Sequence, residues 1–155
     1  MSTIDTRLAE LGITLPTPAA PVANYVGTVR TGNLLVVSGQ LCFNGEGKLA
    51  ATGKLGTGTV TIEDARVAAR YCAVNVLAQI KAAVGSLDKV VRVVRLGGFI
   101  AATADFTTHP AVMNGASDLM VEVFGDKGRH ARSTIGVPSL PMDSTVEVEA
   151  LIEVE

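Results

Sequence analysis

Hydrophobic and polar positions along the chain fall into two periods, and the change of period marks the predicted elements. Strand-like patterns occupy 25–30, 34–38, 90–101, 131–137 and 146–154. Apolar residues at helical spacing predict one helix from Thr61 to about Val84 and a second from Pro110 to Phe124. The predicted order is therefore β-β-α-β-α-β-β, with Thr31-Gly32-Asn33 as the turn of an opening hairpin.

Each predicted helix has one apolar stripe, which limits how the elements can pack. The first stripe contains Ile62, Ala65, Ala69, Cys72, Val76 and Ile80, and the second contains Val112, Met113, Ala116, Leu119, Met120, Val123 and Phe124. Thr61 with Asp64 resembles an N-cap pair, and Gly85 and Gly125 are natural helix ends. The economical layout is one sheet with both helices on one face, which leaves the other face to be covered by something else.

The first 20 residues show neither the strand nor the long-helix pattern of the rest of the chain. Residues 2–11 have a helical composition, and a connector rich in proline follows at 15–21, which neither a helix nor a central strand tolerates. We interpret residues 1–20 as an N-terminal helix and Pro-rich appendage, and residues 21–155 as the single domain.

Composition limits the class of protein. The chain has 155 residues, of which 13 are basic and 15 acidic, and no basic run indicates a nucleic-acid surface. Two cysteines in a chain of this size do not make a disulfide framework. No signal peptide and no membrane span are recognised, so we expect a cytoplasmic protein without nucleic-acid or membrane partners.

Three further features are interpreted as structural. The glycine-dense stretch 44–58 lacks the lysine spacing of a phosphate-binding loop and is predicted to be a surface loop. His109 and His130 have no partner at metal-ligand spacing, so no metal site is expected. His109 precedes Pro110 and is assigned to helix capping, and Gly97-Gly98 predicts a bulge or a close backbone approach in its strand.

The last two predicted strands carry the charged residues on which a functional interpretation depends. Alternation places Arg132 and Thr134 on one face of the first strand, and Glu147 and Glu149 on the polar face of the second. If the apolar faces cover the helices, the guanidinium and the carboxylates share the reverse of the sheet. From the pattern alone, Arg132 could be an edge arginine that pairs with Glu147 across adjacent strands.

Two separated motifs resemble the RidA/YjgF proteins, also called the L-PSP endoribonuclease family. The first runs from Asn24-Tyr25-Val26 through Val37-Ser38-Gly39-Gln40, and the second comprises Arg132-Ser133, Leu140-Pro141 and Glu147-Val148-Glu149-Ala150. The likeness implies small trimeric enzymes that hydrolyse reactive imines. It also implies an α+β, chorismate-mutase-like fold, with one mixed sheet, two helices on one face and a trimeric barrel.

The resemblance also implies roles for individual residues. Arg132 would grip the carboxylate of a 2-imino or 2-enamino acid through its paired N–H donors, and Glu147 would position or deprotonate the attacking water. The matching pocket positions are Tyr25, Ser38, Gly39, Asn114 and Thr134. His130 shares the face of Arg132 and is a candidate pocket member. Neither a metal nor an organic cofactor is implied.

The chain departs from the family pattern at Thr134, where the best-characterised imine deaminases have cysteine. The 44–58 stretch is also longer, and residues 1–20 are extra. The expected function is hydrolysis of reactive imino acids to 2-oxo acids and ammonia at inter-subunit sites. The alternative is a non-catalytic or regulatory trimer that binds small carboxylates such as 2-oxo acids, and an RNA-cleaving enzyme is disfavoured by the absent basic surface.

Overall fold

The computed structural model describes residues 3–155, so residue 2 of the predicted N-terminal helix lies outside it. The helices and strands, in chain order, are α1 Thr3–Glu10, β1 Thr28–Thr31, β2 Leu34–Leu41, α2 Ile62–Val84, β3 Val90–Ala101, α3 His109–Phe124, β4 Ala131–Val137 and β5 Val146–Val154. Short 3₁₀ turns cover Leu87–Lys89, Gly125–Gly128 and Pro141–Asp143. The predicted β-β-α-β-α-β-β order is confirmed, with α1 added before it.

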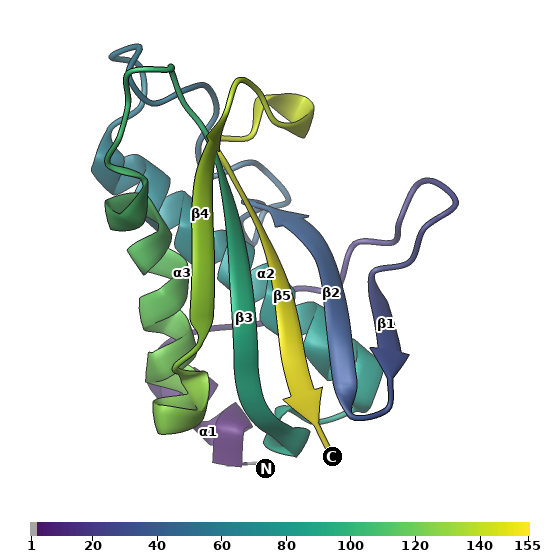
Figure 1. The fold of residues 1–155 in the computed structure, drawn as a ribbon. Helices are drawn as coiled ribbons and strands as arrows, with labels where there is room; N and C mark the ends of the chain where they lie inside the picture. Colours follow the sequence, from purple (N-terminus) through teal and green to yellow (C-terminus); the bar gives the residue numbers. More distant parts are fainter. Residues whose placement is uncertain (1–2) are drawn as a thin grey trace.

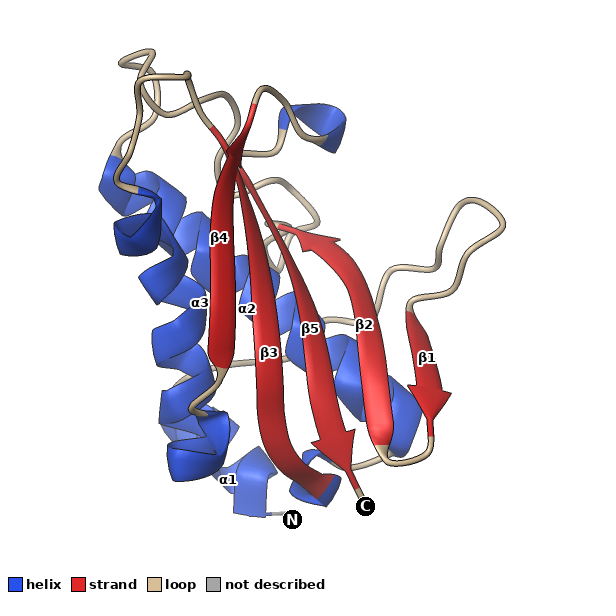
Figure 2. Ribbon diagram, viewed as in Figure 1, coloured by secondary structure: helices blue, strands red, loops and turns tan. Residues whose placement is uncertain are grey.

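The strands form one five-stranded mixed sheet in the order β1-β2-β5-β3-β4. The β3–β4 pair is parallel, and the other pairs are antiparallel. Both long helices cover the same face of this sheet (Figures 1 and 2). The predicted α+β fold, with one mixed sheet and two helices on one face, is therefore confirmed. Because β3 lies between them, β4 and β5 are not adjacent. This excludes the alternative in which Arg132 pairs with Glu147 across adjacent strands.

The core lies between the sheet and the two helices. Along β5 buried and half-buried residues alternate strictly, so Val146, Val148 and Ile152 face the helices. The Thr61–Asp64 capping box starts α2, and the glycines at 85 and 125 end α2 and α3. The predicted buried stripe of α3 is confirmed throughout. In α2 the prediction is wrong only at Ile62, the first residue of the helix, which is 39% exposed.

Two irregular regions differ in part from expectation. Gly97 and Gly98 do not interrupt β3, whose register shifts lie earlier, between Val90 and Arg95. The two glycines instead allow a close approach, because a Cβ on either would collide with Glu149 on one face or Met113 on the other. The 44–58 loop is mostly exposed, but Leu55 is buried and anchors it beside the end of β3.

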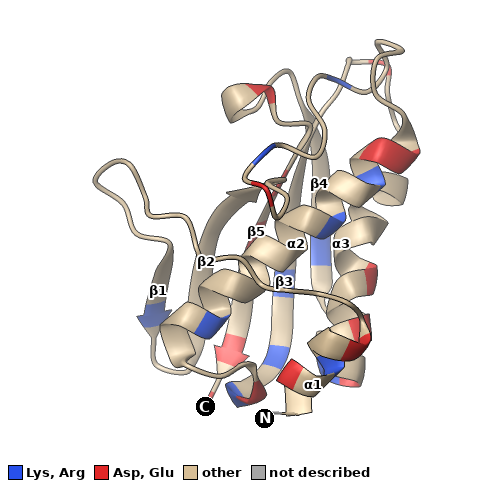
Figure 3. Ribbon diagram, turned by 180° about the vertical axis from the view of Figure 1, so that it is seen from behind, with Lys and Arg blue, Asp and Glu red and all other residues tan. Residues whose placement is uncertain are grey.

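The N-terminal segment packs against the helical layer. Leu8 of α1 is buried in the main core, and Arg7 Nε donates to the Glu122 carbonyl at 2.8 Å. Lys81 of α2 forms an ion pair with Asp5 at 2.7 Å. Seen from behind in Figure 3, the chain then leaves α1 and crosses over α2 toward β1. This path carries residues 11–20 from one end of the helical layer to the other.

By length and composition α2 could cross a membrane, but 56% of its most apolar window is buried inside the protein. Its buried side chains contact α3 and the sheet. Burial of this kind is typical of a core helix.

Candidate functional site

Arg132 lies on the edge strand β4 and points toward α3. Its Nη1 donates to Asn114 Oδ1 at 2.9 Å and to Ser117 Oγ at 3.1 Å. Both partners are on α3, so the guanidinium lies on the helix-covered side of the sheet. The expectation that Arg132 shares the reverse face with the carboxylates is wrong, because β4 is at the sheet edge and α3 supplies polar partners there.

A directional chain of hydrogen bonds holds this guanidinium. His130 Nδ1 lies 2.6 Å from the Gly128 carbonyl, which can only accept, so Nδ1 carries the proton. The free Nε2 then accepts from Ser117 Oγ at 2.9 Å, which leaves Ser117 to accept from Arg132. Burial lowers the pKa of His130, and this outweighs the hydrogen bond to the Gly128 carbonyl, which raises it; the charge of Arg132 lowers it further, so the neutral ring is favoured. The bonds occupy Nη1 and leave Nε and Nη2 without a partner among the described residues.

Glu147 lies on the opposite, uncovered face of the sheet. Its neighbours Val146 and Val148 are buried in the core, so alternation directs its own side chain away from the helices. Burial raises the pKa of the Glu147 carboxyl, and the nearby Glu149 raises it further. Arg95 pairs with Glu149 at 3.7 Å, whereas no ion pair to Glu147 occurs within residues 3–155. A half-buried carboxyl of this kind can exchange a proton.

A β-bulge in β2 accommodates the Glu147 carboxylate. Val37 pairs with Ala150 and Gln40 with Val148, so Ser38 and Gly39 together face one residue of β5. Glu147 Oε1 occupies the place where a Cβ on Gly39 would stand. Ser38 and Gly39 therefore lie within a strand rather than at its end, and Gly39 brings the backbone close to the Glu147 carboxylate.

Tyr25 and Gly39 line one hollow of about 290 Å³ on the surface. The Tyr25 side chain is exposed, and Ser38 Oγ donates to the Val26 carbonyl at 2.7 Å, which ties the segment before β1 to β2. The predicted site residues thus fall into two groups. Tyr25, Ser38, Gly39 and Glu147 form one group, and Arg132 with Asn114 forms the other.

Thr134 lies two residues beyond Arg132 on the same face of β4, beside Gly98 of β3. Its Oγ1 is buried and is the one side-chain oxygen or nitrogen in residues 3–155 that is buried without a hydrogen-bond partner. The hydroxyl is therefore not offered to solvent from this protomer. A buried, unpartnered hydroxyl costs free energy, which makes this position sensitive to substitution.

Sequence reasoning missed Ser117 and misassigned His109. Ser117 follows Asn114 by one helical turn, a spacing that predicts a shared face with it. His109 does not cap α3, because Thr108 is the N-cap residue and makes no side-chain capping bond. The His109 ring instead packs edge-on against Phe106, with centroids 5.1 Å apart, and fills the space that Gly136 leaves open.

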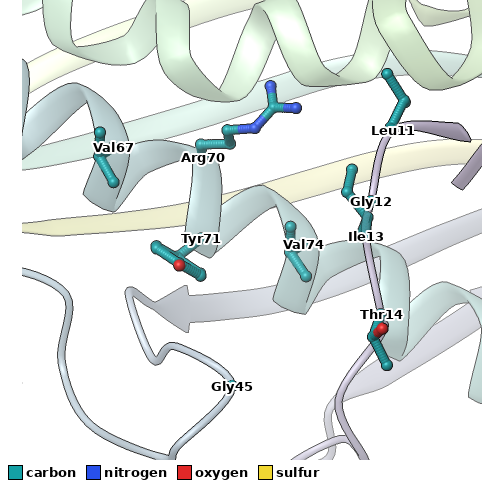
Figure 4. A pocket seen from close by; sticks show the side chains of 9 residues that line it. All are labelled: Leu11, Gly12, Ile13, Thr14, Gly45, Val67, Arg70, Tyr71 and Val74. Carbon is teal, nitrogen blue, oxygen red and sulfur yellow. The ribbon is translucent and has the colours of Figure 1, made fainter. Parts of the chain in front are cut away.

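A different hollow, of about 380 Å³, lies between residues 11–14, the Gly45 turn and α2 (Figure 4). Its one cationic side chain, Arg70, pairs with Glu122 at 2.8 Å. None of the predicted site residues lines it. Within residues 3–155 no cluster of three His, Cys, Asp or Glu side chains could hold a metal ion.

Comparison with known proteins identifies the family. The family described as "YjgF/chorismate_mutase-like, putative endoribonuclease" matches residues 5–154. Protein TCP17 of Trypanosoma cruzi is 49% identical over 95% of this chain and 91% of its own length. A Dermatophagoides farinae protein named 2-iminobutanoate/2-iminopropanoate deaminase is 31% identical over 92% of this chain and 95% of its own.

Solved structures agree with this assignment. Protein Atu1372 of Agrobacterium tumefaciens, of unknown function, superposes with a TM-score of 0.91 at 48% identity, covering 98% of this chain and 92% of that one. The YjgF gene product of Escherichia coli superposes with a TM-score of 0.60 at 25% identity, covering 88% and 93%. With its motifs, fold and relatives in agreement, the chain belongs to the RidA/YjgF family.

Proposed function

We propose that the protein hydrolyses reactive 2-imino and 2-enamino acids to 2-oxo acids and ammonia, at sites shared by neighbouring subunits of a homotrimer. The observation that carries the proposal is that the chain has two complementary groups. The Arg132 guanidinium is held by α3 and keeps two donors free, and the half-buried Glu147 carboxyl has a raised pKa. The first is suited to an anionic substrate and the second to proton transfer.

Arg132 would bind the substrate carboxylate through Nε and Nη2, the side of the guanidinium that its α3 partners leave free. Two parallel N–H donors orient a carboxylate in its plane, and they would therefore fix the adjacent imine carbon. Lysine, a point charge, could not impose this orientation.

Glu147 would take a proton from water as the water oxygen bonds to the imine carbon. The same carboxyl would return this proton to nitrogen, which gives a carbinolamine. It would then carry the remaining hydroxyl proton to nitrogen as the C=O bond forms, the C–N bond breaks and ammonia leaves. The products are a 2-oxo acid and ammonia, and water supplies the new oxygen atom, so no redox partner is required. A pKa raised by burial suits a group that must both accept and donate a proton.

The placement of the two groups favours a site between subunits. Arg132 and Glu147 lie on opposite faces of the sheet, so one protomer cannot present both to one small molecule. The uncovered face carries exposed apolar side chains at Val29, Val36 and Ile135. A second copy packed there would bury them and could bring its own edge strand and Arg132 toward Glu147.

The names of the relatives suggest two activities, imine deamination and RNA cleavage. The charged residues of this chain fit deamination better. Acidic and basic residues are interspersed along the ribbon in Figure 3. The sequence contains no run of basic residues of the kind that RNA phosphates attract. The described residues also lack a neighbouring pair of histidines that could serve as acid and base. A small anionic substrate fits the single braced arginine.

The second candidate is a regulatory trimer that binds 2-oxo acids through Arg132 without turnover. Thr134 favours it, because the position that holds a thiol in well-characterised deaminases here holds a buried hydroxyl. The anchoring role of Arg132 is the same in both candidates. They differ only in whether Glu147 performs chemistry.

The two candidates are separated by one assay. Imines are generated from amino acids by an amino-acid oxidase, and 2-oxo acid release is followed with wild type, Arg132→Ala and, as a control, Arg30→Ala at an exposed hairpin position. The proposed function requires acceleration that is lost in Arg132→Ala alone. Equal rates for all three proteins, combined with 2-oxo acid binding that needs Arg132, would establish the regulatory candidate instead.

A further inference from the structure

The Pro-rich connector before β1 forms one wall of the hollow that Tyr25 and Gly39 line. Residues 19–22, which we call the strap, line this hollow together with Tyr25, Gly39 and Met142. Gly39 also contacts Glu147, because Glu147 Oε1 occupies the space that a Cβ atom on residue 39 would need. The strap therefore reaches the neighbourhood of the proposed proton-transfer group, rather than packing only outside the domain.

One buried side chain of α2 holds the strap in place. Gln79 Nε2 lies 3.4 Å from the Ala19 carbonyl and 3.5 Å from Gln40 Oε1, so it connects the strap to β2. Gln79 Oε1 lies 2.6 Å from the position that a Cβ on Gly27 would occupy. A glycine at 27 thus makes room for the amide that holds the strap.

The strap is stiff and apolar. Pro21 fixes its own φ and restricts Ala20 to extended backbone, so the wall loses little entropy when a ligand binds. The strap presents the methyl groups of Ala19 and Ala20, the Pro21 ring and Val22. Met142 is exposed on the lining and has a positive φ of 57°. No acidic or basic side chain lines the hollow.

From these observations we propose that the strap forms one side of the subsite for the substrate's side chain and selects apolar chains longer than a methyl group. The inference rests on the proposed function, because Glu147 and a neighbour's Arg132 would hold the imino-acid end. The hollow of about 290 Å³ far exceeds the ~30 Å³ that a group as small as a water molecule fills. A branched four-carbon side chain would bury apolar surface against the strap, and a methyl group would leave most of the hollow empty.

The test compares two imines on strap variants. Imines made from leucine and from alanine are supplied to wild type, to Ala20→Trp, which fills the hollow, and to Thr17→Trp, an exposed position of the same segment outside it. Wild type is expected to favour the leucine-derived imine in kcat/KM. Ala20→Trp should lower that preference at least about tenfold while leaving the alanine-derived imine within about threefold of wild type, and Thr17→Trp should change neither.

Three outcomes overturn the inference. The first is an unchanged preference for the leucine-derived imine in Ala20→Trp. The second is the same loss of preference in Thr17→Trp. The third is a change of oligomeric state in Ala20→Trp, measured by native mass, which would make the strap a subunit contact. If wild type hydrolyses neither imine, the proposed function fails separately. The strap is then tested by titrating pyruvate and 4-methyl-2-oxopentanoate, and only the longer acid should lose affinity in Ala20→Trp; equal affinities throughout would reject the subsite.

Discussion

Arg132 and Glu147 lie on opposite faces of one sheet, on strands that β3 separates. The guanidinium is braced from α3, and the carboxylate sits over the glycine of a β-bulge on the uncovered face. A small substrate can meet both groups only if they come from different copies of the chain.

Subunit sharing predicts complementation between two inactive variants. Arg132→Ala and Glu147→Gln should each be inactive alone, whereas trimers reassembled from an equal mixture should recover about a quarter of wild-type activity. The reason is statistical, because one site in four then combines an intact arginine from one copy with an intact glutamate from the next. Activity is measured after joint unfolding and refolding. A mixture as inactive as its components would place both groups of a site in one protomer.

Gly39→Ala should mimic loss of Glu147. The added Cβ would collide with Glu147 Oε1 and displace the carboxylate, so turnover should fall by roughly 10²–10⁴-fold, as for removal of a general base. Gly45→Ala is the matched control, because nothing lies within 4 Å of its Cβ position. Imine turnover and circular dichroism are compared for the two variants. Full activity in a folded Gly39→Ala protein would contradict the role of Glu147.

Ser117 is a positioning residue for Arg132. Ser117→Ala removes one of the two bonds to Nη1, and we expect KM to rise about three- to tenfold with kcat nearly unchanged. Ser117→Thr, which keeps the hydroxyl, should recover most of the loss. Steady-state kinetics with both variants provide the measurement. A fall in kcat at constant KM would assign Ser117 to the chemical step instead.

Thr134→Val should stabilise the protein. The variant keeps the shape of the side chain and removes a buried hydroxyl that has no partner, so the free energy of unfolding should rise by about 1 kcal/mol. Thr134→Ser retains the hydroxyl and should show no gain. Urea denaturation of both variants provides the measurement, at matched protein concentration. A less stable valine variant would mean that the hydroxyl is satisfied in the assembled protein.

Glu147 should make stability depend on pH with a defined sign. Its pKa is raised by burial and then by Glu149, so the folded protein holds the proton to a higher pH than the unfolded chain does. Its contribution is fully present below the unfolded pKa and is lost as pH rises through the folded pKa. Wild type should therefore lose stability relative to Glu147→Gln between about pH 4 and neutrality.

Urea denaturation across that pH range measures the difference, with Glu46→Gln in an exposed loop as the control. The control should track wild type at every pH. If Glu147→Gln also tracks wild type throughout, burial does not perturb the carboxyl.

Much of the fold follows from local pattern. The spacing of apolar residues predicted α2 and α3, and the Thr61–Asp64 pair predicted the start of α2. Alternation predicted β4 and β5, and the strand-like composition of 90–101 predicted β3. These features depend on neighbours along the chain, which is why a single sequence contains them. The apolar face of β5 was equally readable, because its alternation is uninterrupted.

The sequence by itself determined the element order, the buried faces of α3 and β5, the family and the identity of the candidate site residues. Only the tertiary structure decided that β3 separates the two last strands, that Arg132 turns to α3, and that the strap lines the hollow at Gly39. Strand order and the partners of an edge residue depend on contacts between segments far apart in the chain. Periodicity assigns a residue to a face, but packing decides what covers that face.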